Sequence, residues 1–322
     1  MPDTQVIETR AGELLEPVYR ELLANCESLR VRLLGPNELP DEISAELPGA
    51  FVRADRLAEH LDGLVAGESA RILAAHGHEP RPHVAASRLL HHYLWSLCLL
   101  VSGPWYLARR VPRIRPEDIW IDAATGDLAL RPAAFACLPG DPAAALAETG
   151  PSGFRPASAR PSGVRPASAR PPEVRPASVR PSGVRVLAGE DELRAELRAA
   201  VADHITPVLA LFQSPLKRGQ RALWGMATDD LVSGVWYLGR MLGEEEAAVR
   251  AAAVLLPGDT LPFPGTAGFR RLAGTEGRSH LTRTRLGCCL YYAIRPADTC
   301  VTCPRTCDTE RVHRLEQPAA TG

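Results

Sequence analysis

The sequence lacks the features typical of membrane-spanning, nucleotide-binding and hydrolytic proteins. Its most apolar stretch, residues 93–107, is interrupted by Gly103 and Pro104, and it is shorter than the roughly 20 residues that a membrane-spanning helix needs. No GxGxxG or GxxxxGKS/T motif is present, so there is no support for a nicotinamide or nucleotide site within the chain. No Ser-His-Asp set, pair of carboxylates or His-x-x-x-His pair with a nearby carboxylate is convincing either.

The start of the sequence gives no reason to expect a leader, and the net charge is small. Its first residues, MPDTQVIETRAGELLEP, include acidic side chains and neither the basic nor the apolar region of a secretory signal. We therefore expect a cytoplasmic protein without a transmembrane segment. The formal net charge of -1 gives no reason to expect a nucleic-acid partner.

The cysteines are unevenly distributed. Cys26, Cys98 and Cys137 stand singly in apolar or helical stretches, whereas the other five lie between Cys288 and Cys307. A disulfide framework would spread its cysteines through a small secreted chain, while clustered cysteines in an intracellular protein favour metal or redox chemistry. We expect the three scattered cysteines to be buried apolar residues.

Helical spacing of apolar residues dominates both halves of the chain. The first predicted helix is broken late, and the third ends before Pro104 because proline interrupts helical hydrogen bonding. Strand-like residues on either side of the turn DAATGD predict a β-hairpin within residues 113–134. The predicted helices cover residues 11–34, 55–76, 84–103, 190–211, 220–242 and 244–256.

A proline- and arginine-rich repeat of the form PSGVRPASAR fills residues 151–185. Proline at this density favours extended, solvated chain, so we predict a disordered linker. The alternative is a basic arm that contacts anionic lipid or an acidic partner, which leaves room for peripheral membrane contact.

Two segments resemble each other, LVSGPWYLAR at residues 100–109 and LVSGVWYLGR at 231–240. The structural interpretation is a duplicated helix packed in the core. The functional interpretation is that Trp105, Tyr106, Trp236 and Tyr237 line two sides of one ligand cavity.

The C-terminal segment carries two pairs of cysteines. Cys288 and Cys289 are adjacent, ten residues follow, and Cys300-Val-Thr-Cys303 completes the set. Four thiolates satisfy either a tetrahedral zinc ion or the two irons of a 2Fe-2S cluster. Adjacent cysteines argue against an ordinary zinc ribbon, because neighbouring side chains on a strand point to opposite faces. Spacing alone favours iron–sulfur and leaves structural zinc or a thiol–disulfide switch as alternatives.

The motif Cys-Cys, ten residues, Cys-x-x-Cys-Pro, preceded by arginines, resembles the FhuF-type ferric-siderophore reductase family. The resemblance extends to the helical segment of residues 204–231 and, more weakly, into the first half. It implies a 2Fe-2S cluster held by Cys288, Cys289, Cys300 and Cys303, which passes single electrons to siderophore-bound Fe(III). The additional Cys307 departs from the pattern, and we expect it to be a free thiol.

Arginines outnumber acidic residues in the C-terminal segment. Such a patch suits an acidic, ferredoxin-like donor protein or an anionic chelate, with Arg283 and Arg285 as candidate contacts, although a solvated basic surface is an equal alternative. With no nucleotide site in the chain, we expect the electron donor to be another protein.

The sequence thus predicts an α+β protein, mainly helical with a small β-sheet and a C-terminal iron–sulfur module. Its predicted function is that of a cytoplasmic ferric-siderophore reductase. The alternative is a zinc-stabilised or redox-sensing binding protein without enzymatic activity. The predicted regions are an N-terminal α+β region at 1–150, the linker at 151–185, a helical region at 186–265 and the iron–sulfur module at 266–322.

Overall fold

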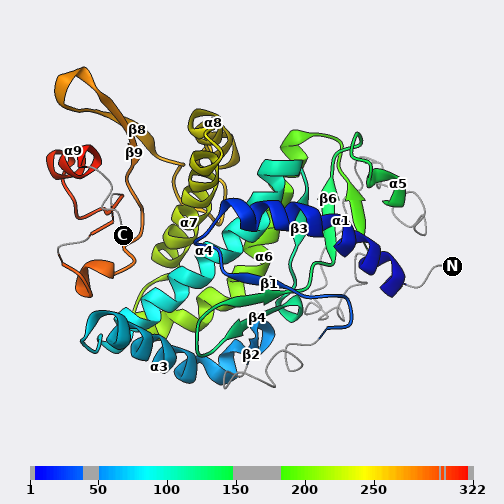
Figure 1. Ribbon diagram of the computed structural model, residues 1–322, viewed down its shortest axis with the longest axis horizontal. Coiled ribbons are helices and arrows are strands. Elements are labelled where there is room, and N and C mark those ends of the chain that lie inside the picture. The colour runs from blue at the N-terminus through cyan, green and yellow to red at the C-terminus, as the bar shows by residue number, and fades with distance from the viewer. Residues whose placement is uncertain (1–3, 39–50, 148–182, 297–298, 301, 318–322) are drawn as a thin grey trace, which may run out of the picture.

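The computed structural model describes residues 4–38, 51–147, 183–296, 299–300 and 302–317. It confirms a mainly helical α+β fold with small sheets (Figure 1). One hydrophobic core joins the segments before residue 147 to those after residue 183, so the regions predicted at 1–150 and 186–265 pack as a single body.

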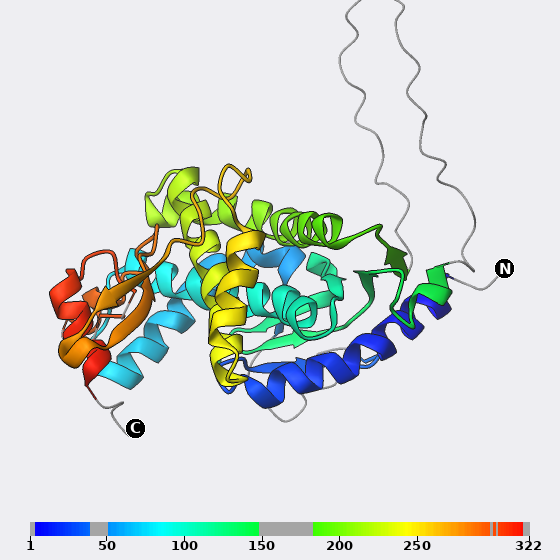
Figure 2. The same cartoon turned by 90° about the horizontal axis from the view of Figure 1, so that it is seen from above.

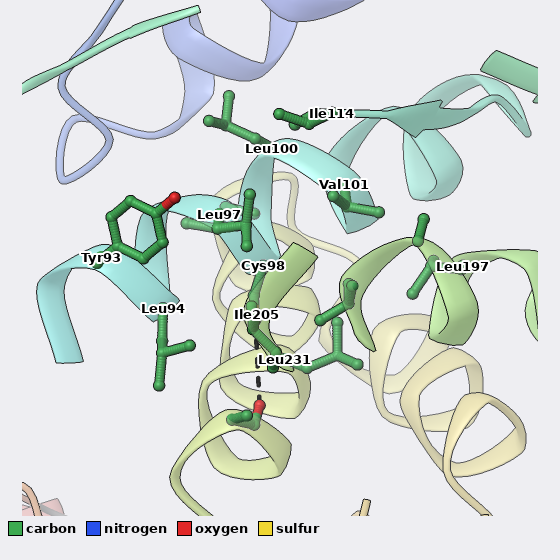
Figure 3. Close-up of a cluster of buried hydrophobic side chains, with 14 of the residues drawn as sticks. Tyr93, Leu94, Leu97, Cys98, Leu100, Val101, Ile114, Leu197, Ile205 and Leu231 are labelled. Carbon is green, nitrogen blue, oxygen red and sulfur yellow. Dashed lines mark hydrogen bonds between the residues drawn. The ribbon is translucent and has the colours of Figure 1, made fainter. Parts of the chain in front are cut away.

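Long helices form the centre of this body. The apolar faces of α4, α6 and α7 meet there, and Figure 3 shows Leu97, Ile205 and Leu231 in this contact. The scattered cysteines are buried as predicted, and Cys98 reaches the Ala227 carbonyl across the interface of α4 and α7. The helices are α1 (Thr4–Asn25), α3 (Leu57–His76), α4 (Pro82–Ala108), α6 (Glu190–Leu216), α7 (Gln220–Met241) and α8 (Glu245–Leu255).

Helix α4 does not end before Pro104, as the sequence predicted, but continues to Ala108. Proline has no N–H to donate to the carbonyl four residues earlier, which is that of Leu100. The buried hydroxyl of Tyr19 on α1 donates to this Leu100 oxygen instead, at 3.1 Å. Because a tertiary contact satisfies the freed carbonyl, the helix tolerates the proline.

Helix α4 is the one helix in the described part of the chain that is long and apolar enough to cross a membrane. Most of its apolar stretch is buried within the protein. This burial agrees with the predicted core helix.

The predicted hairpin is present as β4 (Ile119–Asp122) and β5 (Leu128–Leu130), which pair antiparallel. Strand β1 (Val31–Leu33) adds to β5 in parallel, and β2 (Phe51–Arg53) pairs with β4, which gives the order β1-β5-β4-β2. The first predicted helix, residues 11–34, thus has its expected late break after Asn25, but the residues beyond the break form a strand rather than more helix. Val31 and Leu33 recur at strand spacing and follow the turn at Cys26.

A second sheet, in the order β3-β6-β7, brings together the two sides of the proline- and arginine-rich repeat. It consists of β3 (Val111–Arg113), β6 (Ala134–Cys137) and β7 (Val184–Val186), and the short helix α5 (Ala144–Ala147) follows β6. Residues 148–182 lie outside the described residues. The last residues of the repeat form part of β7, so the prediction of disorder is wrong there.

The C-terminal arm, which consists of the described residues 266–296, 299–300 and 302–317, forms one end of the molecule (Figures 1 and 2). It begins with an antiparallel hairpin of β8 (Phe269–Ala273) and β9 (Ser279–Arg283), which the sequence analysis did not predict. An irregular segment with the cysteines follows, and α9 (Asp308–Glu316) comes near its end. A small apolar cluster of Ile72, Val84 and Ile294 packs the arm against α3 and α4.

Candidate metal centre

Four cysteines of the C-terminal arm line one small pocket just beyond β9. Cys289 and Cys303 are buried, while Cys288 and Cys300 are partly exposed. Gly287 precedes them at a point where any Cβ would lie 2.8 Å from the Met226 side chain, so glycine allows this loop to approach α7 closely. The remaining lining residues are Arg285, Gly287, Tyr291, Tyr292, Thr299 and Pro304.

The thiols interact across the two halves of the motif. A hydrogen bond with Cys300 lowers the pKa of Cys289 to about 4. The same hydrogen bond raises the pKa of Cys300. Burial raises the pKa of Cys288. Metals are bound by thiolates, so loading a metal into this pocket releases the protons that the thiols carry.

Side chains from outside the motif hold the backbone that carries these cysteines. Ser87 on α4 donates to the Cys289 carbonyl at 3.2 Å, and Arg218 donates to the Cys288 carbonyl at 2.7 Å. The buried Arg311 of α9 donates to the Cys303 carbonyl at 2.8 Å. The cysteine-bearing loop is therefore held in place from two sides, by the helical body and by α9.

Asp229 on α7 ties the strand before the cysteines to the core. Its carboxylate accepts from Arg283 at 2.7 Å and from the backbone N–H groups of Leu286 and Gly287 at 3.0 and 2.6 Å. Burial raises the pKa of Asp229 despite the nearby arginine charges. The next residue, Asp230, accepts from Arg285 at 2.8 Å.

His91 on α4 completes this network through a 2.9 Å contact between its Nδ1 and Asp230. The pKa of Asp230 is lowered, because the charges of His91 and Arg285 outweigh the opposing effect of burial. Burial lowers the pKa of His91. The network therefore runs from His91 on α4 through Asp230 on α7 to Arg285 of the arm.

The sequence analysis did not identify Asp229 and Asp230 as site residues. Two adjacent acids within the apolar helix of residues 220–242 are an unusual pattern, and both side chains are fully buried. Acidic residues are almost never fully buried unless they are paired. This pattern indicates that the two carboxylates have buried, positively charged partners, but it does not identify the residues that provide the charge.

The arginine candidates of the sequence analysis have different positions. Arg283 is fully buried and bonded to Asp229, Ser233 and the Ala267 carbonyl, so it cannot contact a donor protein or substrate in this conformation. Arg285 is also buried, but it lines the cysteine pocket. Buried carboxylates draw both side chains inward, which the count of charges in the segment does not reveal.

The aromatic candidates do not surround one cavity. Trp236 and Tyr237 line a cleft beside the arm, whereas Trp105 is buried in the core. Tyr106 donates to Glu244 at 3.2 Å and does not line that cleft. The two similar segments lie on α4 and α7, which pack against each other as the structural interpretation predicted.

Among the described residues, no three His, Cys, Asp or Glu side chains converge as they would around a single metal ion. The four thiols instead surround a shared pocket, with Cys289 and Cys300 in direct contact. Four cysteine thiolates are the usual ligand set of a 2Fe-2S cluster, so the residues present fit this cofactor.

Residues 285–305 match the family model of the FhuF 2Fe-2S C-terminal domain. The matched residues include all four pocket cysteines, and the resemblance suggested by their spacing is confirmed for this segment. The cofactor that the match indicates is a 2Fe-2S cluster. None of the curated proteins or solved structures in the comparison matches the chain.

Proposed function

We propose that this protein is a ferric-siderophore reductase, which reduces siderophore-bound Fe(III) to Fe(II) by one electron in the cytoplasm. The observation that carries the proposal is the pocket lined by Cys288, Cys289, Cys300 and Cys303 within a segment that matches a 2Fe-2S domain. These four cysteines are the proposed ligands.

The proposed reaction releases iron from its carrier. Hard oxygen donors suit the small, highly charged Fe(III) ion better than the larger Fe(II) ion, so one added electron weakens the chelate. A 2Fe-2S cluster supplies one-electron chemistry at a potential that depends on hydrogen bonds to sulfur and on solvent exposure. The chain's own residues hold the thiols and keep the pocket next to solvent.

The position of the pocket supports electron delivery by a separate protein. Cys288 and Cys300 are partly exposed, and the exposed Arg305 stacks over the Tyr292 ring at 4.2 Å, beside the pocket. Arg218 also reaches the pocket backbone from the α6–α7 turn. A positively charged rim of this kind steers an acidic, ferredoxin-like donor by long-range electrostatics.

The test is a single-turnover reaction under anaerobic conditions. The reduced protein is mixed with a panel of ferric chelates, while its visible absorbance reports oxidation and an Fe(II)-specific chromogenic chelator reports the product. We expect one Fe(II) to form for each electron lost by the protein, with at least one siderophore-type chelate. Reduced protein that remains reduced in the presence of every chelate contradicts the proposal.

A further inference from the structure

A cleft lies between the C-terminal arm and the helical body, beside the cysteine pocket. Residues of α4 and α7 line it from the body, and residues of β9 and α9 line it from the arm. Its volume of about 860 Å³ is in the range of small-molecule sites. The cleft can therefore hold a compact chelate.

The cleft and the cysteine pocket share a wall. Arg285 lines both cavities. Thr302, which lies between Cys300 and Cys303 in the chain, lines the cleft, and its carbonyl accepts from the Arg285 backbone N–H at 3.3 Å. A molecule bound at this end of the cleft would therefore contact Thr302, which is adjacent in sequence to the proposed cluster ligand Cys303.

One wall of the cleft is aromatic. Trp95 on α4 and Tyr237 on α7 form an edge-to-face pair with centroids 5.6 Å apart, and both rings are partly exposed. Trp236 lines the same wall, and its indole N–H donates to Glu245 at 2.8 Å. Aromatic side chains of this kind pack favourably against flat, electron-rich rings.

The charged groups of the cleft are mostly cationic. Arg240, Arg285 and Arg314 line it, while Glu245 is the one acid among the described lining residues. The Arg240 side chain is 57% exposed, and its guanidinium lies 3.8 Å from Glu245. The carboxylates that pair with the other two arginines, Asp230 and Glu310, do not line the cleft.

We propose that this cleft binds the ferric chelate, and that the chelate carries anionic aryl oxygen donors, as catecholates do. The inference rests on the proposed function, because it concerns the substrate of that reaction. The aryl rings pack against Trp95 and Tyr237, and Arg240 and Arg314 attract the negative charge. Arg285 forms the end of the cleft nearest the cysteine pocket.

Binding is measured without electron transfer by using gallium(III), which resembles Fe(III) in charge and size but is not reduced under these conditions. The probes are the trianionic gallium complex of a hexadentate tris-catechol and the neutral gallium complex of a tris-hydroxamate. Isothermal titration calorimetry on the full-length, cluster-loaded protein gives the affinity for each. We expect the catecholate complex to bind at least tenfold more tightly.

The two similar helical segments supply matched controls. Tyr237→Ala and Arg240→Gln change the cleft, whereas Tyr106→Ala and Arg109→Gln change the corresponding positions of the similar segment at 100–109, which do not line it. We expect each cleft variant to bind the catecholate complex at least fivefold more weakly and each control to bind it like the unchanged protein. Because Arg240 is exposed, Arg240→Gln should fold normally. Thermal unfolding shows whether Tyr237→Ala remains folded.

Equal binding by the cleft variants and the controls overturns the cleft assignment, and preference for the hydroxamate complex overturns the substrate class. These failures are distinct from failure of the proposed function. If the unchanged protein reduces ferric chelates and the cleft variants do so with the same KM, the reductase proposal stands and the cleft proposal falls. If no ferric chelate is reduced and no gallium complex binds, both fall.

Discussion

Cys307 differs from the other C-terminal cysteines in position rather than in chemistry. It is exposed, directly precedes α9 and does not line the pocket that the other four share. Residue spacing suggested this separation, because Cys307 lies outside the two pairs. The four proposed ligands could be predicted from the sequence because they form two cysteine pairs within one short segment.

Replacing Cys300 with serine should abolish cluster loading, because a hydroxyl is a poor substitute for a thiolate. The matched variant Cys307→Ser should retain nearly all of its iron and acid-labile sulfide. Both contents are measured after anaerobic purification, together with the visible spectrum. Equal loss in the two variants would mean that the choice of ligands is wrong.

His204 on α6 should make stability depend on pH. Its Nε2 lies 2.6 Å from the Tyr93 hydroxyl and its Nδ1 lies 2.8 Å from the Ile114 carbonyl, so the buried ring is neutral with the proton on Nδ1. Burial lowers the pKa of His204. Below about pH 6.5 the unfolded chain therefore binds a proton that the folded chain does not, and stability falls as pH falls.

Urea denaturation at pH 7.5 and pH 5.5 tests this, with His204→Gln as the comparison. Glutamine can make both hydrogen bonds but does not titrate, so we expect the loss of stability between the two pH values to be smaller in the variant. The same loss in both proteins would show that another group, such as His91, accounts for the pH dependence.

At the scale of elements, hydrophobic periodicity predicted α3, α6, α7 and α8 closely, because each buries one face in a common core. It failed where a distant residue decides the outcome. Helix α4 continues through Pro104 because Tyr19, far away in the sequence, satisfies the Leu100 carbonyl. The β8–β9 hairpin was missed because its strands show mostly partial burial and so have a weak alternating pattern.

The hydroxyl of Tyr19 should stabilise α4 only because residue 104 is proline. Tyr19→Phe leaves the buried Leu100 carbonyl unpaired, at a cost of about 1–3 kcal/mol in the free energy of unfolding. In a Pro104→Ala background the restored N–H can bond that carbonyl, so the same change should cost less. A double-mutant cycle by urea denaturation measures this difference. Equal costs in the two backgrounds would contradict the explanation.

The attachment of the C-terminal arm to α7 should depend on Asp229. Asp229→Ala leaves Arg283 buried without its carboxylate, and breaking a buried ion pair in this way costs about 3–5 kcal/mol. The control is Asp308→Ala, which removes an exposed pair with Arg270 within the arm and should have little effect. Hydrogen exchange of the Leu286 and Gly287 amides should accelerate in the Asp229 variant alone. Unchanged exchange would mean that other contacts hold the arm.

At the scale of the whole molecule, composition and periodicity were enough for the fold class but not for the arrangement. The mainly helical α+β fold follows from the long amphipathic segments. The contacts of Ser87 with the Cys289 carbonyl of the arm and of His91 with Asp230 on α7 could not be predicted, because they join residues separated by more than a hundred positions. The cleft arises from the same long-range packing, and its aromatic wall combines α4 with α7.

Metal analysis of the whole protein tests most directly whether the four pocket cysteines hold a 2Fe-2S cluster. The protein is purified without oxygen, and its iron, acid-labile sulfide and zinc are quantified alongside its visible spectrum. We expect about two irons and two sulfides per chain and a coloured protein that bleaches on reduction. A colourless protein with one zinc per chain and no iron would contradict the account.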